Sequence, residues 1–213
     1  MSTPARTVTN TGTKKNIGRF FSQKMQTTVV YESLLERDYM YLLEIDPEVK
    51  SYSSQPLTIS YNIDKQSRRY TPDFLVERIS KTQIVEVKPV TELNLEENIK
   101  RFEYIASNFE HQGWEFMVVT DEMIKLEPLL SNVKLLYRYK SEKLSSQQYL
   151  ACQQYFKHKK AVELQIALQD LEKSVISQKT LYKLLFLGFV ETDLMQPISG
   201  KSYIRLSNNA LKN

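Results

Sequence analysis

The chain has 213 residues, a formal net charge of +4 and a hydrophobic fraction of 41%, which suits a soluble protein with one medium domain, or a catalytic domain and a small second one. No stretch approaches the roughly 20 apolar residues that span a bilayer, and the first residues lack the apolar block of a secretory signal, so we expect a cytoplasmic protein without a membrane partner. A lone cysteine, Cys152, excludes an internal disulfide, and with only two histidines in the chain it nearly excludes a Cys/His zinc site.

Residues 1–30 are interpreted as a basic N-terminal arm. The stretch from Met1 to about Gly18 is rich in Ser, Thr and Asn and has little apolar content, which is typical of a mobile segment. The segment from Ile17 to Phe21 carries the first bulky side chains, and it is the part of the arm that can pack against the body of the protein.

Residues 31–139 alternate between helical and strand-like patterns. The predicted elements are a helix over 32–45, strands over 57–61, 70–77 and 83–88, a helix over 96–111, and strands over 116–120 and 133–137. The first helix ends at Asp46, because the residue before a proline avoids helical geometry. A polar connection over 62–69 joins the first two strands, and a hairpin turn near 78–82 joins the next two. The order predicts an α/β domain.

The remainder of the chain, residues 140–213, has a different pattern. Short helices are predicted over 145–156, 159–171 and 177–187, and strand-like runs over 189–192 and 203–206. Ser177 suits the N-cap of the third helix, and Gly188 suits its end. Helices followed by a hairpin predict a small winged-helix-like domain, and the same elements also occur in many other small domains.

Three charged side chains lie close together on two predicted strands. Asp73 stands at the start of one strand, and alternation places Glu86 and Lys88 on one face of the next. If the two strands form a hairpin, Asp73 converges on that face, where carboxylate and backbone oxygens suit Mg²⁺ or Mn²⁺. A single charge on such a strand usually faces solvent. Glu86 and Lys88, however, interrupt a β-branched run, where burying charge is costly unless it is paired or holds a metal.

The spacing of these residues also matches a known signature. Pro72-Asp73, followed after twelve residues by Glu86-Val-Lys88, fits the PD-(D/E)xK pattern of nucleases. With Glu32-Ser-Leu-Leu-Glu36-Arg-Asp38, Gln55-Pro56 and Thr71-Pro-Asp73-Phe-Leu-Val76 in the same order, residues 30–140 resemble the TnsA-type transposon endonucleases. The resemblance implies an α/β, restriction-endonuclease-like core with a central mixed sheet flanked by helices, plus a small C-terminal winged-helix-like domain.

The resemblance also assigns the site. The implied catalytic residues are Glu36, Asp73, Glu86 and Lys88, and the implied ligands of Mg²⁺ or Mn²⁺ are Asp73, Glu86, the backbone carbonyl of Val87 and Glu36. The family pattern selects Glu36 over Glu32, which lies four residues earlier on the same helical face. Lys88 is expected to orient the nucleophile or to stabilise the transition state. Gln55 is expected to support the site, and its alternative role is that of a turn residue.

The activity implied by the resemblance is metal-dependent cleavage of DNA at the 5′ ends of a transposon by one subunit of a heteromeric transposase. The implied partners are double-stranded DNA at the transposon ends, a TnsB-like transposase that cuts the 3′ ends, and a TnsC-like ATPase regulator, all in the bacterial cytoplasm. Residues 1–31, 32–139 and 140–213 carry formal charges of +5, −6 and +5. DNA is therefore drawn to the flanks and repelled by much of the middle, and we expect the flanks and the partner to deliver it.

Two other functions stay open at this point. A stand-alone restriction or repair nuclease of the same superfamily would cut DNA without a transposase and would carry its own base-reading elements. A catalytically silent DNA-binding scaffold is the alternative from another class, and the intact set of four site residues argues against it. Metal-dependent nicking of transposon-end DNA, with and without the neighbouring transposase, distinguishes the three functions.

Overall fold

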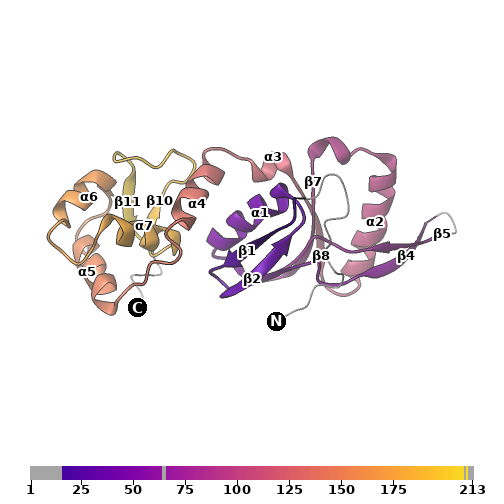
Figure 1. The fold of residues 1–213 in the computed structure, drawn as a ribbon, viewed down its shortest axis with the longest axis horizontal. Helices are drawn as coiled ribbons and strands as arrows, with labels where there is room; N and C mark the ends of the chain where they lie inside the picture. Colours follow the sequence, from indigo (N-terminus) through magenta and orange to yellow (C-terminus); the bar gives the residue numbers. More distant parts are fainter. Residues whose placement is uncertain (1–15, 64–65, 209, 211–213) are drawn as a thin grey trace. The chain divides into compact units, whose positions relative to one another are not determined.

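The structure, a computed structural model, describes residues 16–63, 66–208 and 210 (Figure 1). The chain divides into two compact units, of which unit 1 ends at Lys125 and unit 2 begins at Leu126. Residues 1–15, the first half of the expected basic arm, lie outside the described residues, and the arm stays a prediction there. Among the helices of the described residues, none combines the length and the apolar character needed to cross a membrane.

Unit 1 is built around a four-stranded mixed sheet. Its elements are β1 (Gly18–Ser22), β2 (Thr27–Tyr31), α1 (Leu34–Ile45), β3 (Val49–Ser54), β4 (Ile59–Ile63), β5 (Gln66–Tyr70), β6 (Phe74–Arg78), β7 (Thr82–Lys88), the 3₁₀ turn η1 (Val90–Glu92), α2 (Glu96–Glu110), β8 (Glu115–Thr120) and α3 (Asp121–Ile124). The sheet has the order β3-β6-β7-β8, in which β3, β6 and β7 are antiparallel and β8 is parallel to β7. The hairpins β1-β2 and β4-β5 are separate two-stranded sheets. The expected α/β core with a central mixed sheet is confirmed.

Helices α1 and α2 cover opposite faces of this sheet (Figure 1). Phe74 of β6 is paired with Val85 of β7, on the face where Tyr39 of α1 meets Phe74 with ring centroids 5.6 Å apart. The next pair in register, Leu75 and Ile84, faces the other way and packs with α2. Both faces of β7 are therefore covered, which explains why its sequence is so apolar.

The hairpin β1-β2 occupies the second half of the expected arm and packs on α1. Glu44 of α1 is buried, and its carboxylate accepts a hydrogen bond from the Ser22 hydroxyl at 2.5 Å. The backbone N–H groups of Gln23 and Lys24 donate to the same carboxylate at 2.8 and 3.1 Å, and the Tyr52 hydroxyl donates at 2.8 Å. A buried carboxylate is tolerated only with such hydrogen-bond partners. Contacts between residues distant in the sequence therefore fold the β1-β2 segment, whose composition predicts an arm.

Unit 2 is a small set of helices with a short sheet. Its elements are α4 (Leu129–Tyr137), α5 (Ser146–Phe156), β9 (Val162–Glu163), α6 (Leu164–Asp170), α7 (Gln178–Phe186), β10 (Val190–Thr192) and β11 (Tyr203–Leu206). The strands form an antiparallel sheet in the order β10-β11-β9. As predicted, Ser177 caps α7, and Gly188 follows its end with a left-handed φ of +67°. The unit begins before residue 140 because α4 packs on α7, where the Tyr137 and Phe186 ring centroids are 6.0 Å apart.

Several elements differ from the sequence prediction. Residues 133–137 were expected as a strand, and this was wrong: they lie in α4, where Leu130, Val133 and Leu136 are buried at helical spacing. A short apolar run does not by itself distinguish a strand from a helix. The connection expected over 62–69 contains the end of β4, which runs to Ile63, and most of β5, which begins at Gln66. Strand β3 is additional, and its mostly polar sequence gave no alternating signal.

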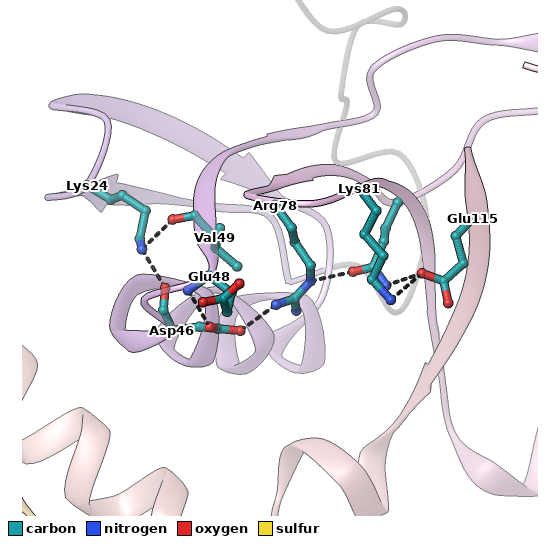
Figure 2. A network of polar contacts seen from close by, with 8 residues as sticks. Lys24, Asp46, Glu48, Val49, Arg78, Lys81 and Glu115 are labelled. Atoms are coloured by element: carbon teal, nitrogen blue, oxygen red, sulfur yellow. Dashed lines mark hydrogen bonds and ion pairs between the residues drawn. The ribbon is translucent and has the colours of Figure 1, made fainter. Parts of the chain in front are cut away.

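A polar network joins α1, β6, β7 and β8 at one end of the central sheet (Figure 2). The Arg78 guanidinium donates to the Asp46 carboxylate at 2.7 Å and to the Gln83 side-chain oxygen at 2.6 Å. Gln83 and Lys81 each contact Oε2 of Glu115 at 2.7 Å. Arg78 is paired with Asp46, and Lys81 with Glu115, so the charges cancel. We therefore interpret the network as structural: it connects the strands at this end of the sheet.

We expect Glu44→Ala to lower the free energy of unfolding by about 2–4 kcal/mol, because it leaves several buried donors without an acceptor. Urea unfolding followed by circular dichroism measures the change. The matched control is Glu48→Ala, which removes an exposed carboxylate close by in the chain and should cost less than about 0.5 kcal/mol. Equal losses in the two variants would show that Glu44 does not hold the hairpin.

Candidate active site

A cleft of unit 1, about 700 Å³ in volume, brings the expected catalytic side chains together. Its lining includes Glu36 from α1, Asp73 before β6, and Glu86, Val87 and Lys88 at the end of β7. Further acids in the lining are Glu32 and Glu92, and further cations are Arg69 and Arg101. The fold thus gathers groups that are distant in the sequence, from α1, β5, β7, η1 and α2 and from the segment just before β6.

Asp73 stands directly before β6, at the point where that strand meets the end of β7. Its carboxylate Oδ2 accepts a hydrogen bond from the backbone N–H of Val87 at 2.7 Å. Burial raises the pKa of Asp73 well above its usual range, and the neighbouring carboxyl groups of Glu86 and Glu36 raise it further. The cleft therefore concentrates negative charge that a cation would neutralise.

Glu86 is buried in β7, with only 4% of its surface exposed. Its Oε2 accepts a hydrogen bond from the Tyr70 hydroxyl at 2.6 Å, and burial followed by the charge of Glu86 raises the pKa of Tyr70, which stays a donor. Its Oε1 lies 3.2 Å from Nζ of Lys88 and 3.9 Å from Nη2 of Arg101. Glu86 and Lys88 therefore share a face, as strand alternation predicts.

Lys88 is the partly exposed cation beside these carboxylates. Burial by itself disfavours its protonated form, but the charges of Glu86 and Asp73 outweigh burial and raise the pKa of Lys88. The ammonium group therefore stays charged at neutral pH. Such a group suits electrostatic stabilisation better than general-base chemistry, which needs a group that readily gives up its proton.

Glu36 reaches the cleft from the first turn of α1. Ser33 caps this helix by accepting a hydrogen bond from the Glu36 N–H at 3.1 Å, and the Glu36 carboxylate accepts one from the Glu32 N–H at 2.8 Å. Burial raises the pKa of Glu36. Glu32 and Glu36 both line the cleft, but of the two only Glu36 is buried. The charge of Glu36 contributes to the raised pKa of Asp73.

Gln55 touches the site through its backbone. It is buried at the end of β3, and its N–H donates to the Asp73 carbonyl at 2.9 Å. Its φ of +47° is a left-handed conformation that is uncommon for residues other than glycine. Gln55 is not among the residues that line the cleft. Gln55, in the turn before Pro56, therefore supports the backbone of Asp73.

Among the cleft residues that were not singled out from the sequence, two lie against the Glu86 carboxylate. The Tyr70 hydroxyl donates a hydrogen bond to the buried Glu86 carboxylate, and Arg101 of α2 forms an ion pair with the same carboxylate. The signal for Arg101 was its position on the helix, between the buried Asn98 and Ile105 on one face. The apolar Ile99, two residues before Arg101, is 43% exposed, so the apolar residues of this helix do not by themselves mark the face that is buried.

The donor set fits a hard divalent cation. Asp73 and Glu86 supply carboxylate oxygens. Burial raises the pKa of Asp73, the charges of Glu86 and Glu36 raise it further, and bound positive charge would relieve that repulsion. Mg²⁺ usually takes one or two carboxylates and keeps several waters, which matches this pair. In the described part of the chain, no three His, Cys, Asp or Glu side chains are arranged to hold a metal ion by themselves.

We expect Asp73→Asn to stabilise the metal-free protein at neutral pH, because asparagine keeps an acceptor for the Val87 N–H and removes one clustered charge. An acid whose pKa rises on folding loses stability as the pH climbs from its unfolded pKa through its folded one. The melting temperature of the variant in chelator should therefore exceed that of wild type at about pH 7.5, and the gap should close towards about pH 3.5, where both forms are neutral.

Glu48→Gln, an exposed carboxylate outside the cleft, is the control and should show no such gap. Mg²⁺ should then raise the melting temperature of wild type more than that of Asp73→Asn. A variant that is less stable than wild type at neutral pH would contradict the charge clustering.

Comparison with known families bears on this site. Residues 46–121 match the family model described as TnsA-like endonuclease N terminal. The matched range contains Asp73, Glu86 and Lys88, and Glu36 lies outside it. A comparison with curated proteins finds no match. The family match, which spans the central sheet and α2, supports a TnsA-type nuclease.

Proposed function

We propose that this chain is the metal-dependent DNA endonuclease subunit of a heteromeric transposase, and that it cuts the 5′ ends of the transposon during cut-and-paste transposition. The family match suggests a nuclease of the transposase type. The observation that carries the proposal is the convergence of Asp73, Glu86 and Lys88 in one cleft, tied by the hydrogen bond between Asp73 and Val87. Two carboxylates and a lysine in such a cleft suit hydrolysis of a phosphodiester.

The proposed cofactor is Mg²⁺, with Mn²⁺ as a substitute. The residues that would hold it are Asp73, Glu86 and the backbone carbonyl of Val87, with Glu36 completing the shell. Without the ion, these three carboxylates, all among the described residues, are not arranged to hold a metal by their side chains alone. A bound ion of this kind polarises the scissile phosphate and lowers the pKa of a coordinated water. The support for this assignment is the clustering of carboxyl groups around Asp73, whose pKa is raised first by burial and then by the charges of Glu86 and Glu36.

The side chains of the cleft have separate tasks in this proposal. Tyr70 holds one oxygen of Glu86, so the other oxygen faces Lys88 and the cleft. The Lys88 ammonium stays protonated and stabilises the negative charge that grows on the phosphate as water attacks in line. The Gln55 and Val87 N–H groups fix Asp73 from two sides. The reacting groups are therefore positioned before DNA arrives.

We further propose that DNA is delivered by partners. These are double-stranded transposon ends, a TnsB-like transposase that cuts the 3′ ends, and a TnsC-like ATPase regulator, acting together in the bacterial cytoplasm. The described lining of the cleft contains five carboxyl groups and three cationic side chains, within a region of net charge −6 over residues 32–139. Such a site repels a polyanion, which supports dependence on an assembly.

For unit 2 we propose a winged-helix-like domain. The support is its order of elements, in which α5, α6 and α7 precede the β10-β11 hairpin and β9 adds a third strand. Lys173, Lys179 and Lys201 are exposed and available to phosphate. Lys183, by contrast, is buried and donates to the Lys140 carbonyl at 2.6 Å, so it serves the core of the unit.

With the transposase present, Asp73→Ala and Lys88→Ala should each lower nicking of transposon-end DNA by about a hundredfold or more, because each removes transition-state stabilisation. A chelator should abolish nicking by wild type. Gel separation of 5′-labelled DNA measures the rates. The matched control is Lys100→Ala, which removes an exposed lysine paired with Glu96 on the surface of α2 and should leave the rate unchanged.

Equal nicking by Asp73→Ala and wild type would refute the proposed site. Full nicking by wild type without any transposase would instead favour the stand-alone nuclease. Absence of nicking under every condition, with DNA still bound, would favour the silent scaffold.

The charge distribution predicts weak DNA binding by the isolated chain. Titration against transposon-end duplex at about 0.15 M salt should give an affinity close to that for unrelated DNA, in the range of about 10⁻⁴ to 10⁻⁶ M that is typical of non-specific binding. Addition of the transposase should bring the chain onto the transposon end. Tight and sequence-specific binding by the chain alone would contradict delivery by partners.

A further inference from the structure

Arg101 is a cation of the cleft whose contacts with the protein are incomplete. Its guanidinium carbon lies 5.9 Å from the ring centroid of Tyr70 and 5.0 Å from that of Phe102, so stacking fixes the orientation of the group. Its Nε is buried and has no hydrogen-bond partner among the described residues. Its ion pair with Glu86 spans 3.9 Å, which is longer than a hydrogen bond.

Neutralising Glu86 does not account for this arrangement. One oxygen of Glu86 already accepts from Tyr70 at 2.6 Å, and Lys88 lies closer to the other oxygen, at 3.2 Å, than Arg101 does. Buried donors without a partner are rare in folded proteins, and each one calls for an explanation such as a strained site, a catalytic role, or a bound water or ion. A stacked arginine with unused hydrogen-bonding capacity beside a cleft is an arrangement that binds a group from outside.

We propose that Arg101 binds a phosphate group of the DNA strand in the cleft and positions that strand for cleavage; the inference rests on the proposed function. The guanidinium presents its donors in a rigid fork that matches phosphate oxygens. Lys88 lies on β7 and Arg101 on α2, so cations from two different elements would face the DNA strand. In a lining dominated by carboxyl groups, a phosphate needs such a partner to be held at all.

The test measures DNA binding by the full chain in the Asp73→Asn background, which prevents cleavage during the titration. In a titration against a short duplex at several low salt concentrations, Arg101→Ala should weaken binding and lower the slope of log K against log salt by about 0.9, the amount that one phosphate contact contributes. Lys100→Ala is the matched control, because Lys100 precedes Arg101 on α2 but lies outside the cleft lining. It should leave the slope unchanged.

A second readout identifies the phosphate. Duplexes that each carry one uncharged methylphosphonate are titrated in turn. At one position, the substitution should weaken binding by the chain that retains Arg101. The same substitution should have no further effect on binding by Arg101→Ala. Arg101→Lys keeps the charge without the fork, so it should retain the salt slope but bind less tightly than arginine. A purely structural role for Arg101 would change neither the slope nor the pattern of sensitive phosphates.

An unchanged slope and an unchanged methylphosphonate pattern in Arg101→Ala would overturn the proposal. If melting shows that Arg101→Ala does not fold, Arg101→Gln carries the same two measurements with a side chain of closer size. Binding and nicking also separate the two proposals. If Arg101→Ala lowers the slope but the wild-type chain never nicks with its partner, the nuclease is refuted and Arg101 remains a DNA ligand. If the wild-type chain nicks normally but Arg101→Ala leaves the slope unchanged, the nuclease stands and the role of Arg101 is refuted.

Discussion

The hydrogen bond from the Val87 N–H to the Asp73 carboxylate is the contact on which the site depends, because it joins the start of β6 to the end of β7. It sets an acid where two other carboxyl groups already lie, and burial together with their repulsion raises the pKa of Asp73. Such crowding is unfavourable by itself. It persists because the surrounding structure over-determines it: Gln55 holds the Asp73 carbonyl, and Tyr70 holds Glu86. Strain of this kind is characteristic of functional sites.

The two ends of the central sheet treat charge in opposite ways. Where β6 ends and β7 and β8 begin, Arg78 and Lys81 are matched by Asp46 and Glu115, and the charges cancel (Figure 2). At the other end, carboxyl groups outnumber cations in the described lining of the cleft. Because β6 and β7 are antiparallel, each strand has one end in each environment. The paired end stabilises the sheet that holds the unpaired end together.

The excess of acid has a consequence for the reaction. A cleft that repels DNA cannot recruit it by long-range attraction. The proposed function therefore needs positive charge from a bound cation, from side chains on the cleft walls, and from basic segments outside the cleft, on this chain or on its partners. Lys88 and Arg101 are placed for the second of these roles, one on β7 and one on α2. The basic flanks of the chain, +5 on each side, suit the third. In the proposed function, delivery and cleavage therefore fall to different parts of an assembly, and the family match suggests a nuclease of the transposase type.

Local patterns in the sequence were enough to determine the α/β core, the shared face of Glu86 and Lys88, the end of α1 near Asp46, and the ends of α7 at Ser177 and Gly188. Each of these follows from periodicity, capping or a proline, all of which act within a few residues. Only the tertiary structure decided the β1-β2 hairpin, the helix in place of a strand at α4, and the entry of Arg101 into the cleft. For the hairpin and for Arg101 the physical reason is distance along the chain, whereas the short apolar run of α4 is compatible with a strand or a helix. The acceptor for Ser22 is Glu44, and the carboxylate that Arg101 meets is Glu86, so no local pattern records that these groups satisfy one another.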